Sequence, residues 1–174
     1  MHGFHGFPVS EAALMAMLSL ARDLPRSMRQ QARRKWERFP AKLLKDKTVG
    51  IFGVGAIARE LAPRCKALGM AVVGITSAPR QAESFDRMAH RDTLEQAVRE
   101  LDFLVLLTPY APETKHIVSA KIFAAMRPSS YFINLARGGV VDEDALLDAL
   151  RSRKIAGAAL DVFAREPLPE DSPL

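Results

Sequence analysis

From residue 48 onward, short apolar runs alternate regularly with stretches that have helical character. The apolar runs cover residues 48–52, 71–75, 103–107, 131–135 and 156–160. Each run has the length of one buried strand, and each is bounded by residues typical of turns or caps. Continuous apolar strands separated by helices are typical of a parallel sheet covered on both faces. The alternation therefore predicts an α/β fold, a doubly wound parallel sheet, over residues 48–174.

The helices between these strands are predicted from caps and from apolar periodicity. They cover residues 56–68, 92–100, 119–126 and 142–153. Gly69 suits the end of the first helix, because glycine adopts the left-handed conformation that often closes a helix. Asp92, Ser119 and Asp142 are each expected to cap the start of a later helix with a side-chain oxygen.

The region before the sheet has a different character. Residues 1–8 are expected to form a loose leader, because Gly3, Gly6 and Pro8 oppose regular structure. Residues 9–47 are expected to form two leading helices and a basic arm. The first helix should begin at the cap residue Ser10 and run to about residue 21, and the second should cover residues 25–38, with Pro40 after its end. His2 and His5 lack further ligands, so we expect no metal site.

Positive charge is concentrated in one part of the chain. Residues 22–47 hold ten Lys or Arg and three Asp or Glu, whereas the whole chain of 174 residues has a net charge of +5. A basic segment with one Trp could bind nucleic acid. A solvated helix face and connecting arm that also attract an anionic cofactor account for the charge more simply, and no other nucleic-acid motif is present. We therefore expect no nucleic-acid partner.

Composition also bounds the environment of the protein. The chain is 48% apolar and 26% charged, typical of a globular protein, and no apolar run reaches the roughly 18 residues that a membrane span needs. Cys65 is the single cysteine, so no internal disulfide can form. A lone cysteine on a helix is most simply a small buried hydrophobic residue in a reducing compartment. We expect a cytoplasmic protein without membrane contact.

A glycine turn follows the first strand. Its pattern is Gly53-x-Gly55-x-x-Ala58. The first glycine permits a tight turn, the second lets the backbone approach a pyrophosphate, and the small third residue lets helix and strand pack closely. The backbone N–H groups at Ala56 and Ile57, at the positive end of the next helix, would hold the phosphates. A strand, this turn and a helix in that order predict a dinucleotide-binding site.

The end of the second strand bears on which dinucleotide binds. NAD-binding domains commonly place a carboxylate there for the ribose hydroxyls. This chain has Thr76, Ser77 and then Arg80, with no carboxylate between residues 69 and 81. Hydroxyls and a guanidinium suit a 2′-phosphate better than a bare diol. The loop favours NADP over NAD without excluding NAD.

Four segments together resemble the D-isomer-specific 2-hydroxyacid dehydrogenases, a family that includes glyoxylate, hydroxypyruvate and phosphoglycerate dehydrogenases. The segments are VGIFGVGAIA, LLTPYAPETKHIV, INLARGGVVDEDAL and GAALDVFAREPLP. They occur in order and with spacing similar to that of the family, over nearly the whole chain from Val9. The resemblance implies a Rossmann-type cofactor domain and hydride transfer between a nicotinamide and the 2-carbon of a small 2-hydroxy or 2-keto acid.

The resemblance also assigns roles to individual residues. Arg137 matches the arginine that binds the substrate carboxylate and polarises its carbonyl, and Glu166 matches the carboxylate that pairs with a catalytic histidine. The positions implied to lie near the nicotinamide or its ribose are Thr108, Pro109, Leu135, Ala136, Arg137 and Asp161. His116 matches a structural histidine of the family. Each polar residue also has a plainer interpretation: Arg137 could pair with a nearby acid, Glu166 could be a surface acid, and Asp161 could be a cap.

The chain departs from the family pattern in what it includes. The family's catalytic histidine lies downstream of the EPLP segment, and this chain ends at Leu174. The other half of the family's split substrate domain would precede Met1. We therefore expect a cofactor-binding domain that is inactive alone and forms a homodimer through its leading helices, as the resemblance implies. The alternative is a non-catalytic dinucleotide-binding or dimerisation module.

Overall fold

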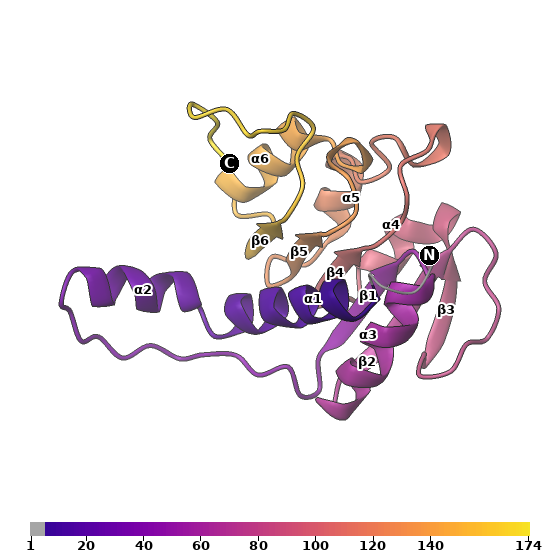
Figure 1. Ribbon diagram of the computed structural model, residues 1–174, viewed down its shortest axis with the longest axis horizontal. Helices are drawn as coiled ribbons and strands as arrows, with labels where there is room; N and C mark the ends of the chain where they lie inside the picture. The colour runs from indigo at the N-terminus through magenta and orange to yellow at the C-terminus, as the bar shows by residue number, and fades with distance from the viewer. Residues whose placement is uncertain (1–5) are drawn as a thin grey trace.

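The computed structural model describes residues 6–174, and the expectations for Gly3, His2 and His5 lie outside that range. Its centre is one sheet of six strands in the order β3-β2-β1-β4-β5-β6 (Figure 1). All neighbouring strands run parallel. The strands are β1 (Thr48–Phe52), β2 (Ala71–Thr76), β3 (Arg87–His90), β4 (Phe103–Leu106), β5 (Tyr131–Asn134) and β6 (Gly157–Leu160). The predicted doubly wound parallel sheet is confirmed, with the strand order of a Rossmann fold.

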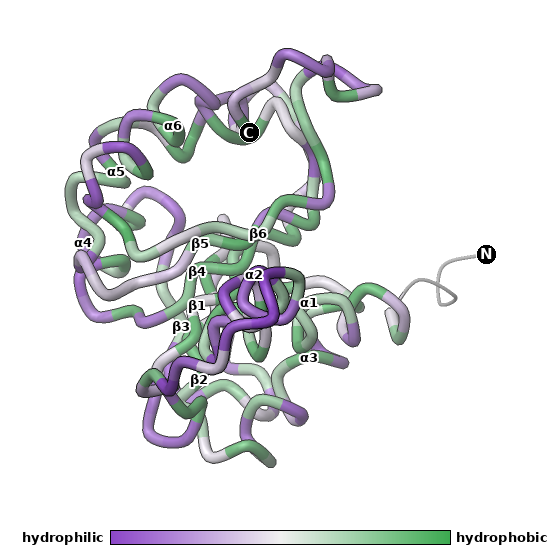
Figure 2. The backbone as a smooth tube through the Cα atoms, turned by 90° about the vertical axis from the view of Figure 1, so that its left-hand side faces the viewer, coloured by the Kyte–Doolittle hydropathy of each residue, from purple (hydrophilic) through white to green (hydrophobic). Residues whose placement is uncertain are grey.

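Helices cover both faces of the sheet, as its continuous apolar strands require. The helices are α1 (Gly6–Ala21), α2 (Leu24–Ala32), α3 (Ala56–Ala67), α4 (Leu94–Val98), α5 (Ala120–Ala125) and α6 (Glu143–Arg151). Side chains of α1 and α3 pack with Val49, Ile51 and Val105 in one core. Side chains of α4, α5 and α6 pack with Phe52 and other strand residues in a second core on the opposite face. Figure 2 shows the apolar strands between these layers.

Helix α1 begins earlier than the sequence predicts. We expected irregular structure through Pro8 and a cap at Ser10, but the helix starts at Gly6. Ser10 is buried inside it, and its hydroxyl donates to the Phe7 carbonyl at 2.8 Å. The first turn packs on α3, where the Arg64 guanidinium lies 4.9 Å from the Phe7 ring centre. Tertiary packing thus outweighs the local preference of Gly6 and Pro8.

Helix α2 ends earlier than predicted, at Ala32 instead of residue 38. None of its residues is buried, so no packed face stabilises a longer helix. Arg34 has a left-handed backbone with φ of 53°, after which the arm runs without regular structure to Lys47. In Figure 1, α2 and this arm project beyond the sheet. Polar residues predominate along them in Figure 2.

Strand β3 was not predicted, because its sequence Arg-Met-Ala-His has no apolar run. It lies at the edge of the sheet, where one side needs no neighbour and burial is partial. The structure also changes the predicted start of the next helix. The cap there is His90, whose ring accepts from the Asp92 N–H, and α4 begins two residues after Asp92.

The other predicted caps have different outcomes. Asp142 caps α6 as predicted, because its carboxylate accepts from the Ala145 N–H at 3.1 Å. Ser119 occupies the cap position of α5, but its side chain makes no capping hydrogen bond. Helix α3 ends at Ala67, and Gly69 has a left-handed backbone with φ of 76° just beyond it.

The environment of Cys65 confirms a structural role. The residue is fully buried between α3 and the sheet. Burial raises the pKa of its thiol to about 12, because the charged thiolate would lose its hydration. None of the helices in residues 6–174 combines the length and apolar character needed to cross a bilayer.

Candidate functional site

The site is built where the parallel strands end. Gly53, Leu107, Leu135 and Asp161 each follow a strand directly, and each extends the sheet by one backbone hydrogen bond. The bonds run from Gly53 N–H to Ile75, Leu107 N–H to Phe52, Leu135 N–H to Leu106 and Asp161 N–H to Asn134. Strands β1 and β4 are neighbours in the sheet, although β2 and β3 separate them in the sequence. A crevice forms outside strand ends at such a switch point, and ligands of open α/β sheets bind there.

The glycine turn after β1 has the geometry that a dinucleotide requires. Gly53 has φ of 103°, and a Cβ on it would lie 2.5 Å from the Thr108 backbone nitrogen. A Cβ on Gly55 would have no heavy atom within 4 Å. Ala58 is fully buried where α3 meets the sheet. The turn therefore leaves open space at Gly55, beside the N-terminal N–H groups of the 12-residue α3, which fits a pyrophosphate.

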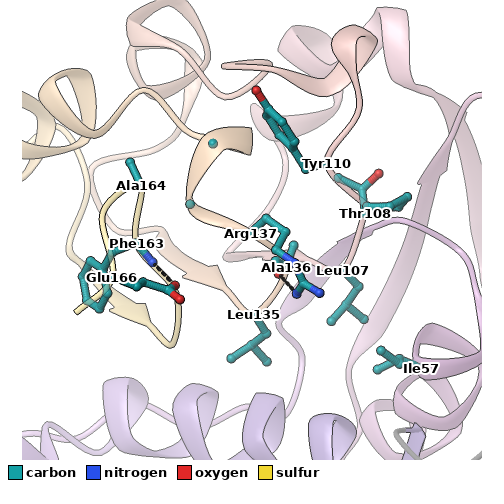
Figure 3. Close-up of a pocket in the computed structure, with 13 residues that line it drawn as sticks. Ile57, Leu107, Thr108, Tyr110, Leu135, Ala136, Arg137, Phe163, Ala164 and Glu166 are labelled. Atoms are coloured by element: carbon teal, nitrogen blue, oxygen red, sulfur yellow. Dashed lines mark hydrogen bonds between the residues drawn. The ribbon is translucent and has the colours of Figure 1, made fainter. Parts of the chain in front are cut away.

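The larger pocket at this edge has a volume of about 840 Å³. Figure 3 shows its lining. The lining residues are Ile57, Leu107, Thr108, Pro109, Tyr110, Leu135, Ala136, Arg137, Gly138, Gly139, Phe163, Ala164 and Glu166. Its walls are therefore mostly apolar or backbone, with Arg137 and Glu166 as the charged side chains.

Arg137 is presented to this pocket by the loop after β5. Asn134, only 1% exposed, fixes that loop with both ends of its amide. Its Oδ1 accepts from the Ala136 N–H at 3.0 Å, and its Nδ2 donates to the Arg137 carbonyl at 3.2 Å. The Arg137 Nη1 donates to the Ala136 carbonyl at 2.6 Å. None of the described residues forms an ion pair with Arg137, so the structure does not support the plainer interpretation of this arginine.

Glu166 is held by the segment after β6. Its Oε1 accepts from the Phe163 N–H at 2.9 Å, and the next amide, of Ala164, donates to Glu143 at 2.6 Å. Figure 3 shows the Glu166 carboxylate directed toward the side of the pocket where Arg137 lies. Residues 29 positions apart in sequence thus line one pocket with opposite charges.

A smaller pocket of about 330 Å³ continues the site past the glycine turn. Its lining residues are Phe52, Gly53, Val54, Gly55, Thr76, Ser77, Arg91, Leu107, Thr108, Pro109, Ala111, Glu113 and Thr114. Leu107, Thr108 and Pro109 border both pockets. Thr114 stabilises this shared wall, since its hydroxyl donates to the Pro109 carbonyl at 2.9 Å.

Most of the site residues predicted from sequence lie in these pockets. Ile57, Leu135, Ala136, Arg137 and Glu166 line the larger one. Gly53, Gly55, Thr76 and Ser77 line the smaller one, and Thr108 and Pro109 line both. Ala56, Arg80 and Asp161 are exposed and lie outside both linings. His116 is also outside them, and its backbone N–H donates to the Gly139 carbonyl at 3.0 Å.

Several lining residues were not singled out from sequence. They include Tyr110, Gly138, Gly139, Phe163 and Ala164 in the larger pocket, and Arg91 and Glu113 in the smaller one. All of these except Arg91 fall within the segments that resemble the family, so their position beside Arg137, Pro109 and Glu166 was an available signal. Arg91 had no such signal, because the strand that it follows was not predicted.

Comparison with known proteins agrees with this geometry. The model of the family described as "D-isomer specific 2-hydroxyacid dehydrogenase, NAD binding domain" matches residues 14–174. A D-3-phosphoglycerate dehydrogenase of Methanocaldococcus jannaschii is 36% identical over 169 residues, covering 95% of this chain and 32% of that protein. The chain thus spans about a third of the length of the curated relatives that it matches.

Solved structures show the same relationship. A D-isomer specific 2-hydroxyacid dehydrogenase family protein of Aeromonas salmonicida superposes with a TM-score of 0.93 and 37% identity, over 100% of this chain and 56% of that one. A D-isomer specific 2-hydroxyacid dehydrogenase of Xanthobacter autotrophicus, in complex with NADPH and MES, superposes with a TM-score of 0.88 and 35% identity, over 95% of this chain and 52% of that one. The chain belongs to the D-isomer specific 2-hydroxyacid dehydrogenase family and corresponds to its NAD binding domain.

Proposed function

We propose that this chain binds a nicotinamide dinucleotide along the carboxyl edge of its sheet. The pyrophosphate would lie at Gly55 and the start of α3, where the backbone leaves open space beside free N–H groups. The adenosine half would occupy the smaller pocket and the nicotinamide half the larger one. The shared wall at residues 107–109 suits one ligand that extends through both.

We further propose that the protein is an oxidoreductase acting on a small 2-hydroxy or 2-keto acid. A bound nicotinamide would supply the hydride chemistry. Arg137 would bind the substrate carboxylate and stabilise negative charge on its oxygen, because a guanidinium is a permanent, planar, bidentate donor. Glu166 would orient the protonated imidazole of a catalytic histidine. The observation that carries the proposal is that Arg137 and Glu166 line one pocket that continues into the glycine turn.

A second candidate is a non-catalytic dinucleotide-binding module. It is favoured by the lining of the larger pocket, where the described residues include no histidine to pair with Glu166. Both candidates predict dinucleotide binding, so turnover distinguishes them. Oxidation of NADPH or NADH with glyoxylate or hydroxypyruvate, catalysed by this chain and abolished in Arg137→Ala, would exclude the module.

We propose NADP as the preferred cofactor. The end of β2 brings the hydroxyls of Thr76 and Ser77 to the smaller pocket and no carboxylate with them. The Xanthobacter relative is a complex with NADPH. Fluorescence titration of the chain with NADPH and NADH tests both levels of the proposal. Binding of neither overturns the cofactor site, and a lower Kd for NADH overturns the preference alone.

We propose that the leading helices form a homodimer contact. Large apolar side chains are exposed along α1, α2 and the arm, and they include Met15, Leu18, Leu24, Met28, Trp36 and Leu43. Water contact with so many apolar groups favours association. Light scattering coupled to size-exclusion chromatography should give twice the monomer mass. Met15→Glu combined with Met28→Glu should restore the monomer mass, and a monomeric wild type would overturn this proposal.

We also propose a cytoplasmic location. Cys65 is free and buried, and no other cysteine exists in the chain to pair with it. Such cysteine usage suits a reducing compartment. Fractionation of cells that express the chain at its native level tests this, and recovery in a secreted fraction would contradict it.

A further inference from the structure

We propose that Arg91 is the residue that binds the 2′-phosphate of NADP, together with Thr76 and Ser77; this rests on the proposed cofactor site. Arg91 is the first residue after β3, and β3 pairs in parallel with β2. Thr76 lies opposite His90 in that pairing. The two strands therefore end at the same edge, and Thr76, Ser77 and Arg91 line one pocket although Arg91 is 14 or more positions from the other two in sequence.

The guanidinium of Arg91 is available for a ligand. Its side chain is 29% exposed, and its Nε lies 3.7 Å from the Asp92 carboxylate. Within residues 6–174, neither Nη1 nor Nη2 of Arg91 donates a hydrogen bond to another residue, so both terminal nitrogens are free to form the paired bonds that a phosphate accepts. The contact to Asp92 would hold the near end of the guanidinium in place.

Arg80, which the sequence suggested for this role, is placed differently. It is exposed in the loop between β2 and β3 and does not line the smaller pocket. A charge in water has little net attraction for a phosphate, because solvent and salt screen it. Arg80 therefore provides a matched control, a second arginine that follows the end of β2 but has no place in the pocket.

His90 fixes the relative position of the residues proposed to contact the phosphate. Its Nε2–H donates to the Ser77 carbonyl at 2.8 Å, and its Nδ1 accepts from the Asp92 N–H at 3.3 Å. One imidazole thus joins the end of β2 to the turn that carries Arg91. This makes His90 a positioning residue for the proposed phosphate site, because ligands bind more tightly to groups that need no reordering.

Glu113 is the one carboxylate among the described residues of this lining. It comes from the loop after β4, whereas the acid that binds ribose hydroxyls in NAD-binding domains follows β2. Its negative charge would oppose a phosphate, and Arg91 supplies the compensating positive charge in the same pocket. Removing the charge of Glu113 should therefore strengthen NADPH binding, the opposite of the effect expected for removing Arg91.

The test compares the Kd of NADPH and of NADH for the chain and its variants by fluorescence titration. Arg91→Ala should raise the Kd of NADPH about tenfold or more, because the charged hydrogen bonds from Arg91 to the 2′-phosphate are lost. It should change the Kd of NADH less than twofold, because NADH has no 2′-phosphate. Arg91→Lys should lie between, since lysine keeps the charge but not the fork. Arg80→Ala should change neither value more than twofold, and Glu113→Gln should lower the Kd of NADPH.

His90→Ala tests the positioning role. It should raise the ratio of the NADPH Kd to the NADH Kd in the wild-type background and leave it unchanged in Arg91→Ala, which a general loss of folding would not do. Urea unfolding midpoints close to wild type establish that each variant is folded. Unchanged NADPH binding in Arg91→Ala and Arg91→Lys, a loss in Arg80→Ala, or tighter binding of NADH than NADPH by the wild type overturns the assignment. Absence of binding by either dinucleotide overturns the underlying cofactor site instead.

Discussion

Gly138 lies directly against the backbone of Phe163, and this contact joins the segment that carries Arg137 to the segment that carries Glu166. A Cβ built on Gly138 would overlap the Phe163 carbonyl group and the Ala164 nitrogen. These neighbours are backbone atoms that cannot rotate away. The close approach of two loops at this point is what places a cation and a carboxylate on the walls of one pocket.

Gly138→Ala should therefore separate the loops and destabilise the domain. We expect a loss of about 1–3 kcal/mol in the free energy of unfolding, typical of overpacking, measured by urea denaturation. The matched control is Gly157→Ala in β6, where a Cβ would meet its nearest side chain, Tyr131, at 3.6 Å in ordinary contact. Equal stability of the two variants would contradict the role assigned to Gly138.

The glycines of the turn after β1 should fail in different ways when substituted. Gly53→Ala places a Cβ at positive φ, 2.5 Å from the Thr108 nitrogen, so it should lower stability by about 1–3 kcal/mol. Gly55→Ala meets no protein atom within 4 Å and should change stability by less than about 0.5 kcal/mol. It should nevertheless raise the Kd for NADPH severalfold, because its methyl group occupies the space proposed for the pyrophosphate. Unimpaired binding by Gly55→Ala would contradict that placement.

Asn134 should be important for stability although it touches no proposed ligand. Asn134→Ala leaves the Ala136 N–H without its acceptor in a buried loop. An unsatisfied buried donor costs about 1–3 kcal/mol, so urea unfolding should show a loss of that size. Ser152→Ala removes an exposed side-chain bond to the Asp148 carbonyl and should stay within about 0.5 kcal/mol of wild type. The prediction is wrong if the two losses are equal.

Local sequence patterns predict the strands that carry apolar runs and miss the one that does not. Strands β1, β2, β4 and β5 were predicted because burial on both faces requires continuous apolar residues. Strand β6 lies at an edge and is only partly buried, but its sequence Gly-Ala-Ala-Leu still reads as an apolar run. Strand β3, at the other edge, was missed because its sequence Arg-Met-Ala-His has no such run. The predicted start of α1 and the predicted end of α2 were wrong for a related reason. Packing on α3 extends the first helix back to Gly6, and lack of packing ends the second at Ala32.

The site could be predicted to the extent that its residues follow apolar strands or match family segments. Arg137 and Glu166 met both conditions, and the structure places them in one pocket. Arg91 met neither, since it follows the strand that has no apolar run. The sequence pointed to Arg80 because Arg80 lies close to the end of β2 along the chain, whereas the pairing of β3 with β2, which brings Arg91 to the same edge, is visible only in the structure.

Asp86 should make folding stability depend on acid pH. Its carboxylate accepts from the Lys66 ammonium and from the Val72 N–H, each at 2.7 Å, and these bonds lower the pKa of the carboxyl group. A carboxyl with a lowered folded pKa stabilises the fold above its unfolded pKa of about 3.9, and the contribution is lost as pH falls through the folded pKa.

Asp86→Asn should therefore lower the urea midpoint at pH 6 and reduce the further fall between pH 4 and pH 2 relative to wild type. Glu170→Gln, an exposed carboxylate near the end of the chain, controls for the loss of one negative charge. A variant with the acid sensitivity of wild type would show that Asp86 is not responsible.

Cys65 should be inert to thiol reagents while the protein is folded. With the thiol pKa raised to about 12 by burial, almost no thiolate exists at pH 8. Iodoacetamide should label the native chain only at the rate of unfolding and should label it fully in concentrated urea. Rapid labelling of native protein would contradict this, and mass spectrometry measures both rates.

The wall at residues 107–109 borders both pockets, so a dinucleotide that fills them is in effect a bivalent ligand. Once one half is bound, the other is presented at an effective concentration of about millimolar, and the joined affinity far exceeds that of either half. That gain depends on the distance between the pockets being fixed. A change that altered the spacing of the two pockets without altering their linings would thus weaken the whole dinucleotide while leaving the affinities of separate AMP and nicotinamide mononucleotide nearly unchanged.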